Sequence, residues 1–236
     1  MTKRYWWVLI TYIITQFSVI AIGPFLYIIT PLDKFEAGIY GNILGFILGL
    51  IAVLLILKPE MKSNQMRGAS TTGETIMWSI LGVFMALIAQ TIAGMIEIHI
   101  LGIKTTSENT QILMDITRSI PIFMILTALI APILEEIVFR KIIFGTLYKR
   151  TNFFIAGLIS ALIFGFVHGE PQHILIYASM GFVFAFLYVK TKRIIVPIIA
   201  HMAMNSLVVI TQYSLTPEDI EKMQKQLEQM QIFIGG

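Results

Sequence analysis

Apolar runs of roughly the length that crosses a bilayer recur along this chain of 236 residues, and they restrict the folds open to it. A transmembrane helix needs about 20 consecutive apolar residues. Hydrophobic residues make up 56% of the chain and charged residues 13%, whereas a soluble domain carries about 25% charged residues. We therefore expect an all-α, polytopic membrane helical bundle of about seven transmembrane helices, with six to eight as the range.

The hydrophobic pattern predicts spans at residues 5–29, 38–57 and 76–96, one that begins near residue 120, and three more at 153–167, 174–189 and 194–213. In the second span Gly41, Gly45 and Gly49 recur every four residues, a pattern that favours close helix packing in lipid. In the fourth span Pro132 is expected to kink its helix, because proline removes a backbone hydrogen bond.

Charge and cysteine content exclude several classes of function. The net charge is only +3 and the chain has no cysteine, so disulfides and thiolate chemistry are excluded. With seven spans, most Lys and Arg residues fall in loops on the side of the N-terminus, as expected for a cytoplasmic face. We expect a multi-pass protein of the cell membrane with a cytoplasmic N-terminus and no nucleic-acid partner.

The fourth span carries three charged residues that hydrocarbon does not tolerate without compensation: Glu135, Glu136 and Arg140. Glu136 and Arg140 are four residues apart, so a helix places them on one face as an ion pair. Glu135 is rotated from Glu136 by roughly 100° and has no local cation. We therefore expect chemistry at Glu135 and a supporting role for the Glu136–Arg140 pair.

Three further polar residues lie in the C-terminal spans: His168, His201 and Asn205. His201 and Asn205 are four apart and share one helix face. A carboxylate that accepts a proton, an imidazole that orients water or binds a metal, and an amide that stabilises an oxyanion are the groups a peptide hydrolase needs. Each also has a purely structural explanation, as an ion pair or as an interior hydrogen-bonding residue.

Other polar residues near the span ends are expected to matter less. His173 is kept as a minor candidate, and His99 is left out. Glu97 and Glu170 are expected to lie at the water boundary, where a carboxylate is readily solvated.

Together these residues form motifs that resemble those of a known family. EEIVFR at 135–140, FGFVH at 164–168 and HMAMN at 201–205 are similar to the E-E-x-x-x-R, F-x-x-x-H and H-x-x-x-N motifs of the CPBP family. Its members are the CAAX-protease and bacteriocin-processing intramembrane proteases, also called the Abi family. The resemblance covers about residues 120–213. It implies a catalytic helical core at 119–214, while the hydrophobic pattern itself predicts N-terminal transmembrane helices and polar loops at 1–118 and an amphipathic tail at 215–236.

The resemblance implies hydrolysis of a peptide bond by activated water. Glu135 would be the general base and His168 would help to hold the water, while His201 and Asn205 would stabilise the oxyanion. Glu136 and Arg140 would support the site. Either one divalent metal ion (zinc), held by Glu135, His168 and His201, or no metal would serve this chemistry.

The expected function is therefore that of an intramembrane endopeptidase whose partners are the lipid bilayer and a small membrane-associated peptide or protein substrate. A non-catalytic scaffold or immunity protein that binds a peptide or a sensor kinase is the alternative, and a proton-coupled transporter is a third hypothesis. One geometric difficulty accompanies the expectation. In straight spans a helix rise of ~1.5 Å per residue places His168 and His201 at different depths, so their convergence requires a tilted, broken or re-entrant segment.

Overall fold

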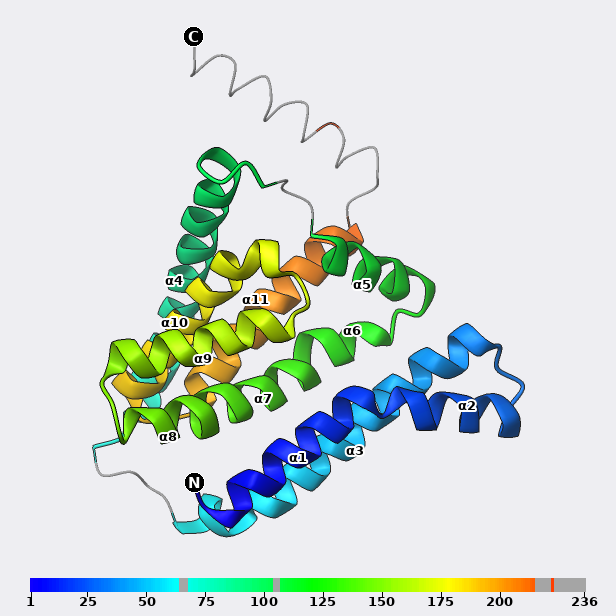
Figure 1. The fold of residues 1–236 in the computed structure, drawn as a ribbon, viewed down its shortest axis with the longest axis horizontal. Coiled ribbons are helices and arrows are strands. Elements are labelled where there is room, and N and C mark those ends of the chain that lie inside the picture. Colours follow the sequence, from blue (N-terminus) through cyan, green and yellow to red (C-terminus); the bar gives the residue numbers. More distant parts are fainter. Residues whose placement is uncertain (64–67, 104–106, 215–221, 223–236) are drawn as a thin grey trace.

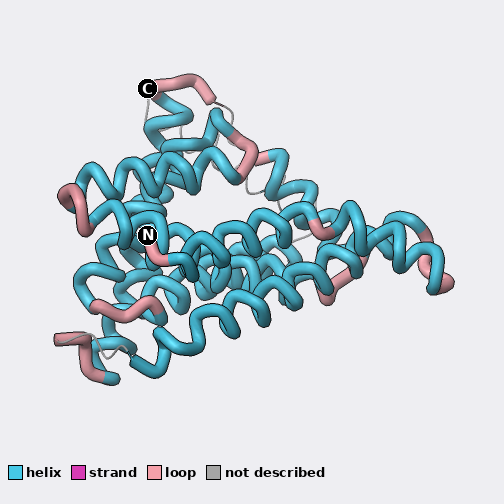
Figure 2. The backbone as a smooth tube through the Cα atoms, turned by 60° about the horizontal axis from the view of Figure 1, so that its bottom comes forward, coloured by secondary structure: helices cyan, strands magenta, loops and turns pink. Residues whose placement is uncertain are grey.

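The computed structural model describes residues 1–63, 68–103, 107–214 and 222, and within these residues the chain is helical with no strand (Figures 1 and 2). The predicted all-α membrane bundle is confirmed. The amphipathic tail predicted for residues 215–236 lies outside the described residues except for Lys222.

The first predicted span is two helices rather than one. Helices α1 (Lys3–Phe17) and α2 (Val19–Ile29) meet at Ser18 with a bend of 47°. The Ser18 hydroxyl donates to the carbonyl of Thr15 at 2.7 Å, and such a local hydrogen bond competes with the regular helical ladder. The span predicted at residues 5–29 therefore consists of two helices with a bend between them, and the pair can still be counted as one span.

Helix α3 (Lys34–Ser63) packs along α1 and α2 through its glycine ridge. A Cβ atom at Gly41 would lie 2.8 Å from the backbone nitrogen of Gly23, which leaves no room for a side chain. At Gly45 the obstruction would be the side chain of Ser18, and at Gly49 that of Thr15. The close packing predicted from the four-residue glycine spacing is confirmed.

A second group of helices lies on the other side of the molecule (Figure 1). Its long members pack against one another: α4 (Thr72–His99), α9 (Phe153–Val167), α10 (Ile174–Thr191) and α11 (Ile195–Ser214). The shorter α5 (Glu108–Ser119) contacts α11, and a 3-10 turn at Pro171–His173 precedes α10.

A continuous helical run from Phe123 to Tyr148 lies between the two groups and contacts both (Figure 1). It is not uniform, because two π-helical stretches interrupt the α-helix, and π-helical turns often occur at functional sites. Its successive parts are α6 (Phe123–Ile125), η1 (Leu126–Ile130), α7 (Ala131–Glu136), η2 (Ile137–Phe144) and α8 (Gly145–Tyr148). Pro132 lies in the first turn of α7, directly after the first π-helical stretch, and the kink expected there stays a prediction.

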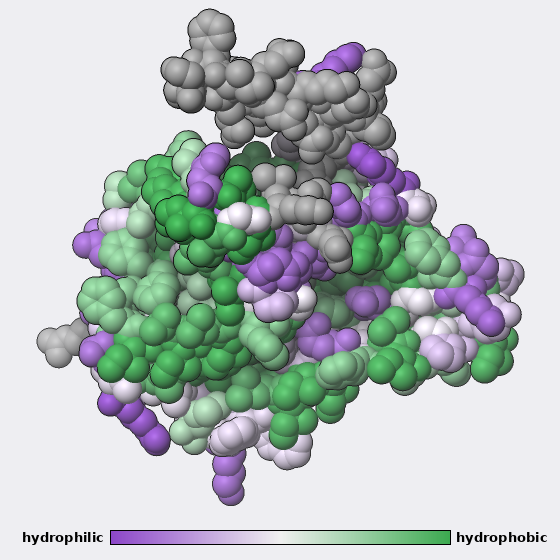
Figure 3. Space-filling view, turned by 45° about the horizontal axis from the view of Figure 1, so that its top comes forward, coloured by the Kyte–Doolittle hydropathy of each residue, from purple (hydrophilic) through white to green (hydrophobic). Residues whose placement is uncertain are grey.

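The outer surface is that of a protein surrounded by lipid. Figure 3 shows broad apolar areas over one face, with hydrophilic residues gathered between them. Large apolar side chains are highly exposed, including Ile28, Phe154 and Phe166. Among the described helices, three are long and apolar enough to span a bilayer, at Lys34–Glu60, Thr72–His99 and Pro171–Thr191, and the bent α1–α2 pair counts as a fourth if taken as one span. The number of seven spans and the orientation of the N-terminus stay predictions.

Candidate active site

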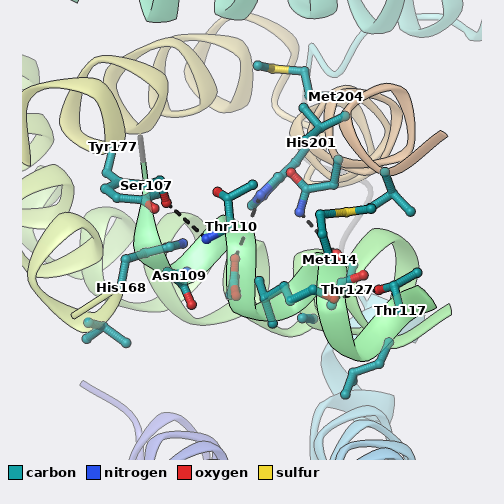
Figure 4. A pocket seen from close by; sticks show the side chains of 18 of the residues that line it. Ser107, Asn109, Thr110, Met114, Thr117, Thr127, His168, Tyr177, His201 and Met204 are labelled. Atoms are coloured by element: carbon teal, nitrogen blue, oxygen red, sulfur yellow. Dashed lines mark hydrogen bonds and ion pairs between the residues drawn. The ribbon is translucent and has the colours of Figure 1, made fainter. Parts of the chain in front are cut away.

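The four side chains predicted to be catalytic line one cavity of about 1030 Å³: Glu135, His168, His201 and Asn205. They come from α7, the end of α9, and α11, while α5 contributes further polar side chains to the same cavity (Figure 4). The structure therefore brings together residues that are up to 70 positions apart (135 to 205) in the sequence.

Glu136 and Arg140 form the ion pair that their spacing predicts, with Arg140 Nε 3.0 Å from Glu136 Oε2. Both side chains are fully buried. The contact is electrostatic, because the guanidinium nitrogens have no partner with hydrogen-bond geometry among the described residues. The guanidinium instead lies over aromatic rings, 4.4 Å from Phe164 and 5.3 Å from Phe184, where cation–π attraction replaces part of the lost hydration.

His201 lies between the two adjacent glutamates. Its Nδ1 is 2.9 Å from Glu136 Oε1, and its Nε2 is 3.8 Å from Glu135 Oε2. The imidazole also stacks on the ring of Phe184, with 4.9 Å between centroids. The side chain of Glu135 is 16% exposed whereas that of Glu136 is 0% exposed. Glu136 therefore holds one nitrogen of the imidazole, and Glu135 lines the cavity.

His168 is fixed in one tautomer by its backbone partner. Its Nδ1 lies 2.7 Å from the carbonyl oxygen of Phe164. A carbonyl can only accept a hydrogen bond, so Nδ1 carries a proton, and in the neutral ring Nε2 carries the lone pair. The His168 ring packs edge-on against Phe164 at 4.4 Å, and His201 lies 6.0 Å from the same phenyl ring. His168 at the end of α9 and His201 of α11 line the same cavity, so the convergence that straight spans made difficult is present in the structure.

The Asn205 side chain forms a hydrogen bond to the backbone of the central helix. Its Nδ2 donates to the backbone carbonyl of Thr127 at 3.1 Å. In the π-helical register the N–H of Ala131 donates to the carbonyl of Leu126, five residues earlier. Pro132 has no N–H to repeat this bond to Thr127, so the Asn205 amide satisfies a carbonyl that proline leaves open.

The predicted metal ligands do not assemble a three-ligand site in this structure. In the part of the chain that is described, no three His, Asp or Glu side chains converge closely enough to hold one ion. His201 already gives Nδ1 to Glu136 and turns Nε2 toward Glu135. The zinc ion considered as one alternative therefore stays a prediction, and the chemistry considered below uses side chains and water alone.

Two carboxylates expected at the water boundary are buried instead, so that prediction was wrong. Glu97 is 1% exposed and Glu170 is 4% exposed. Glu97 Oε2 lies 2.8 Å from His173 Nδ1, and its Oε1 accepts from the backbone N–H of Ile176 at 3.2 Å. Hydropathy does not distinguish a carboxylate at a helix end that faces water from one that faces a neighbouring helix.

Glu170 binds the start of α5. Its oxygens accept from the N–H of Asn109 at 3.0 Å and from the hydroxyls of Ser107 and Tyr177, each at 2.8 Å. Burial raises the pKa of the Glu170 carboxyl, but these hydrogen bonds outweigh it and hold the pKa below its ordinary value. Tyr177, which sequence reasoning missed, also stacks on His168, with 4.2 Å between ring centroids.

Comparison with known proteins agrees with the geometry. A family model described as Type II CAAX prenyl endopeptidase Rce1-like matches residues 117–207. YdiL of Bacillus subtilis (strain 168), named as a candidate membrane peptidase, is 46% identical over 244 residues that cover 100% of this chain and 99% of YdiL. The membrane-embedded CAAX protease MroQ of Staphylococcus aureus (strain USA300) is 35% identical over 237 residues, 94% of this chain and 95% of MroQ.

A more distant relative, the UPF0177 protein YxdF of Lactococcus lactis subsp. lactis (strain IL1403), is 29% identical over 133 residues, which cover 55% of this chain and 73% of YxdF. No solved structure matches. The two bacterial relatives that align over nearly the whole chain agree with the resemblance that the three motifs carry. The chain belongs to the Rce1-like CAAX protease family of membrane peptidases.

Proposed function

We propose that this protein is an intramembrane endopeptidase that uses water activated by Glu135 and His168 to hydrolyse a peptide bond in a small membrane-associated peptide or precursor. The observation that supports this most directly is the difference between the two adjacent glutamates. Glu136 is sealed against Arg140 and His201, whereas Glu135 lines a cavity of about 1030 Å³ beside two imidazoles. Such a cavity has room for a peptide segment and for a water molecule.

In this proposal Glu135 is the general base. It takes a proton from a water molecule whose other hydrogen is donated to the Nε2 lone pair of His168. The water oxygen then attacks the scissile carbonyl carbon and forms a tetrahedral oxyanion. Glu135 returns the proton to the amide nitrogen as the carbon–nitrogen bond breaks, which leaves a new carboxyl end and a new amine. General base catalysis of this kind contributes about 10²–10⁴-fold to rate.

His201 and its partner Glu136 would then stabilise the transition state. The Glu136 carboxylate accepts from Nδ1–H of His201 at 2.9 Å and favours a positively charged imidazole when negative charge develops nearby. Asn205 has two amide hydrogens, and the bond to Thr127 at 3.1 Å uses one of them. The second is available to the oxyanion.

The names of the relatives support the activity. YdiL is named as a candidate membrane peptidase and MroQ as a CAAX protease, so peptide-bond hydrolysis is the reaction class to test first. For Glu135, His168 and His201 to bind a zinc ion, these three side chains would have to move closer together. The chelator and the metal analysis described next test this alternative separately.

The test uses full-length protein purified in detergent and a library of quenched fluorescent membrane peptides. Wild type is compared with Glu135→Gln and His168→Ala, each with and without a chelator, and metal content is measured beside activity. We expect cleavage by wild type and loss of at least 10²-fold in the variants, with folding retained. Wild type that is folded but cleaves no peptide would favour the non-catalytic scaffold, and chelator-sensitive cleavage with stoichiometric zinc would establish the metal mechanism.

A further inference from the structure

The position of His168 depends on a side chain that none of the sequence motifs contains. His168 is the residue that ends α9, and Gly169 after it has a φ of +75°, so the chain reverses direction directly beyond the imidazole. On the α9 side the ring is held by the carbonyl and the phenyl ring of Phe164, but α9 itself does not continue past it. The ring of Tyr177 supplies a further restraint, since it stacks on the imidazole with 4.2 Å between centroids and 27° between planes.

Tyr177 is itself held at its far end by a buried carboxylate. Its hydroxyl donates to Glu170 Oε2 at 2.8 Å, and this oxygen also accepts from the Ser107 hydroxyl at 2.8 Å. The other oxygen of Glu170 accepts from the N–H of Asn109 at 3.0 Å. A carboxylate has about four acceptor sites, so these three hydrogen bonds nearly satisfy it.

The backbone that carries Tyr177 is fixed from the opposite side. Glu97 of α4 binds the imidazole of His173 at 2.8 Å and the N–H of Ile176, the residue before Tyr177, at 3.2 Å. Since Glu97 and His173 are both buried, this contact is shielded from water. The first turn of α10 is therefore held by two carboxylates from different parts of the chain.

Glu170 also connects this assembly to α5, a helix whose side chains line the cavity. Ser107 accepts from the N–H of Thr110 at 3.0 Å and so caps α5, while Glu170 places its charge at the same helix N-terminus, where an anion is favoured. Figure 4 shows Ser107, Asn109 and Thr110 next to Tyr177, with His168 pointing into the cavity. Contacts thus run without interruption from α5 to the catalytic imidazole.

We propose that Tyr177 is a positioning residue that holds the His168 ring in its working orientation, and that Glu170 links this orientation to the placement of α5. The inference rests on the proposed function. The stack with Tyr177 sets the direction of the His168 Nε2 lone pair. When a substrate contacts α5 and moves this helix, Glu170 transmits the movement through Tyr177 to the same imidazole. Since a small misplacement of a catalytic group can cost about 10²-fold, loss of the stack should lower kcat more than it changes KM.

Four variants separate the effect of the stacked Tyr177 ring from the effects of its hydroxyl and of the Glu170 charge. Tyr177→Phe keeps the stacked ring and removes the hydroxyl, whereas Tyr177→Leu removes both. Glu170→Gln keeps the shape and removes the charge at α5. Tyr188→Leu is the matched control, because it makes the same change in the same helix at a ring that has no contact with His168.

The measurements are kcat and KM on a cleaved peptide, and the NMR resonances of isotope-labelled histidine in the detergent-solubilised protein. We expect Tyr177→Leu to lower kcat by about tenfold or more and to shift the His168 ring resonances, which lose the ring current of the stacked tyrosine. Tyr177→Phe keeps the stacked ring but loses the hydrogen bond to Glu170, so its kcat and its His168 resonances should lie between those of wild type and Tyr177→Leu. Glu170→Gln should mainly raise KM, because it loosens α5.

The proposal is overturned if Tyr177→Leu keeps wild-type kcat and His168 resonances, or if Tyr188→Leu loses as much kcat. Absence of cleavage by wild type would contradict the proposed function alone, because the histidine resonances would still show whether Tyr177 orients His168.

Discussion

The amide of Asn205 donates to the carbonyl of Thr127 at 3.1 Å, at the place where Pro132 has no N–H to give. This contact joins α11 to the central helix about two turns before Glu135. It gives a structural role to a residue for which the resemblance implies an oxyanion donor. The two tasks are compatible, because the amide has two hydrogens, and they can be separated experimentally.

The first prediction is that Asn205 and Pro132 are energetically coupled. Asn205→Ala should lower the free energy of unfolding by about 1–3 kcal/mol, the cost of an unsatisfied buried carbonyl. In a Pro132→Ala background the restored N–H can bond to Thr127, so the same change should cost less. Denaturant unfolding of the four proteins in detergent measures the coupling. Equal costs in both backgrounds would mean that the amide does not serve the Thr127 carbonyl.

The second prediction concerns the difference between the glutamates. Glu135→Gln should abolish cleavage while leaving thermal stability close to wild type, because Glu135 faces the cavity. Glu136→Gln should instead destabilise the protein by about 3–5 kcal/mol, since it leaves the buried Arg140 charge without its counter-ion. Parallel melting and activity curves check this. A Glu136→Gln protein as stable as wild type would contradict the buried pair seen at 3.0 Å.

A third prediction tests the glycine ridge. Gly41→Val places side-chain atoms against the backbone of Gly23, where a Cβ would lie 2.8 Å from the nitrogen, and overpacking of this kind costs about 1–3 kcal/mol. Gly38→Ala on the same helix is the control, because a Cβ there meets nothing within 4 Å. It should be neutral or slightly stabilising. Unfolding in detergent should therefore rank Gly41→Val well below wild type and Gly38→Ala at or above it.

The fourth prediction is a pH dependence that arises from Glu170. Hydrogen bonds hold its pKa below the ordinary value of 4.5, so the folded state binds a proton less readily than the unfolded state. The stability that Glu170 contributes is therefore complete above pH 4.5 and is lost as the pH falls through the lower folded pKa. Melting temperatures of wild type and Glu170→Gln should converge as the pH is lowered in this range. A constant difference down to acidic pH would contradict the shift.

The membrane fold and the main polar groups were predictable from sequence, because each rests on local spacing. Hydropathy runs give helices, four-residue glycine spacing gives the contact of α3 with α1 and α2, and four-residue charge spacing gives the Glu136–Arg140 pair. The bend at Ser18 was not predicted, since it depends on a hydroxyl that bonds to its own helix. A serine in an apolar run carries no sign of which way its side chain will turn.

The environment of the site could not be predicted, because it depends on contacts between distant segments. Tyr177 stacks on His168 only because the Gly169 turn folds α10 back along α9. Glu170 and Glu97 are buried because α5 and the first turn of α10 supply donors to them. In the sequence both residues resemble ordinary carboxylates near span ends. Apart from Tyr177, which follows Glu170 by seven residues, their hydrogen-bond partners lie more than 60 residues away.

The enclosure of Arg140 bears on how the protein is made. Its counter-ion Glu136 lies on the same helix, but the rings closest to the guanidinium, Phe164 and Phe184, belong to α9 and α10, which the ribosome produces later. A nascent chain that ends before Phe184 therefore presents the central helix to the insertion machinery with its cation only partly covered. Full enclosure of the guanidinium therefore requires α10, and we expect the catalytic half to complete its packing only after that helix has been made.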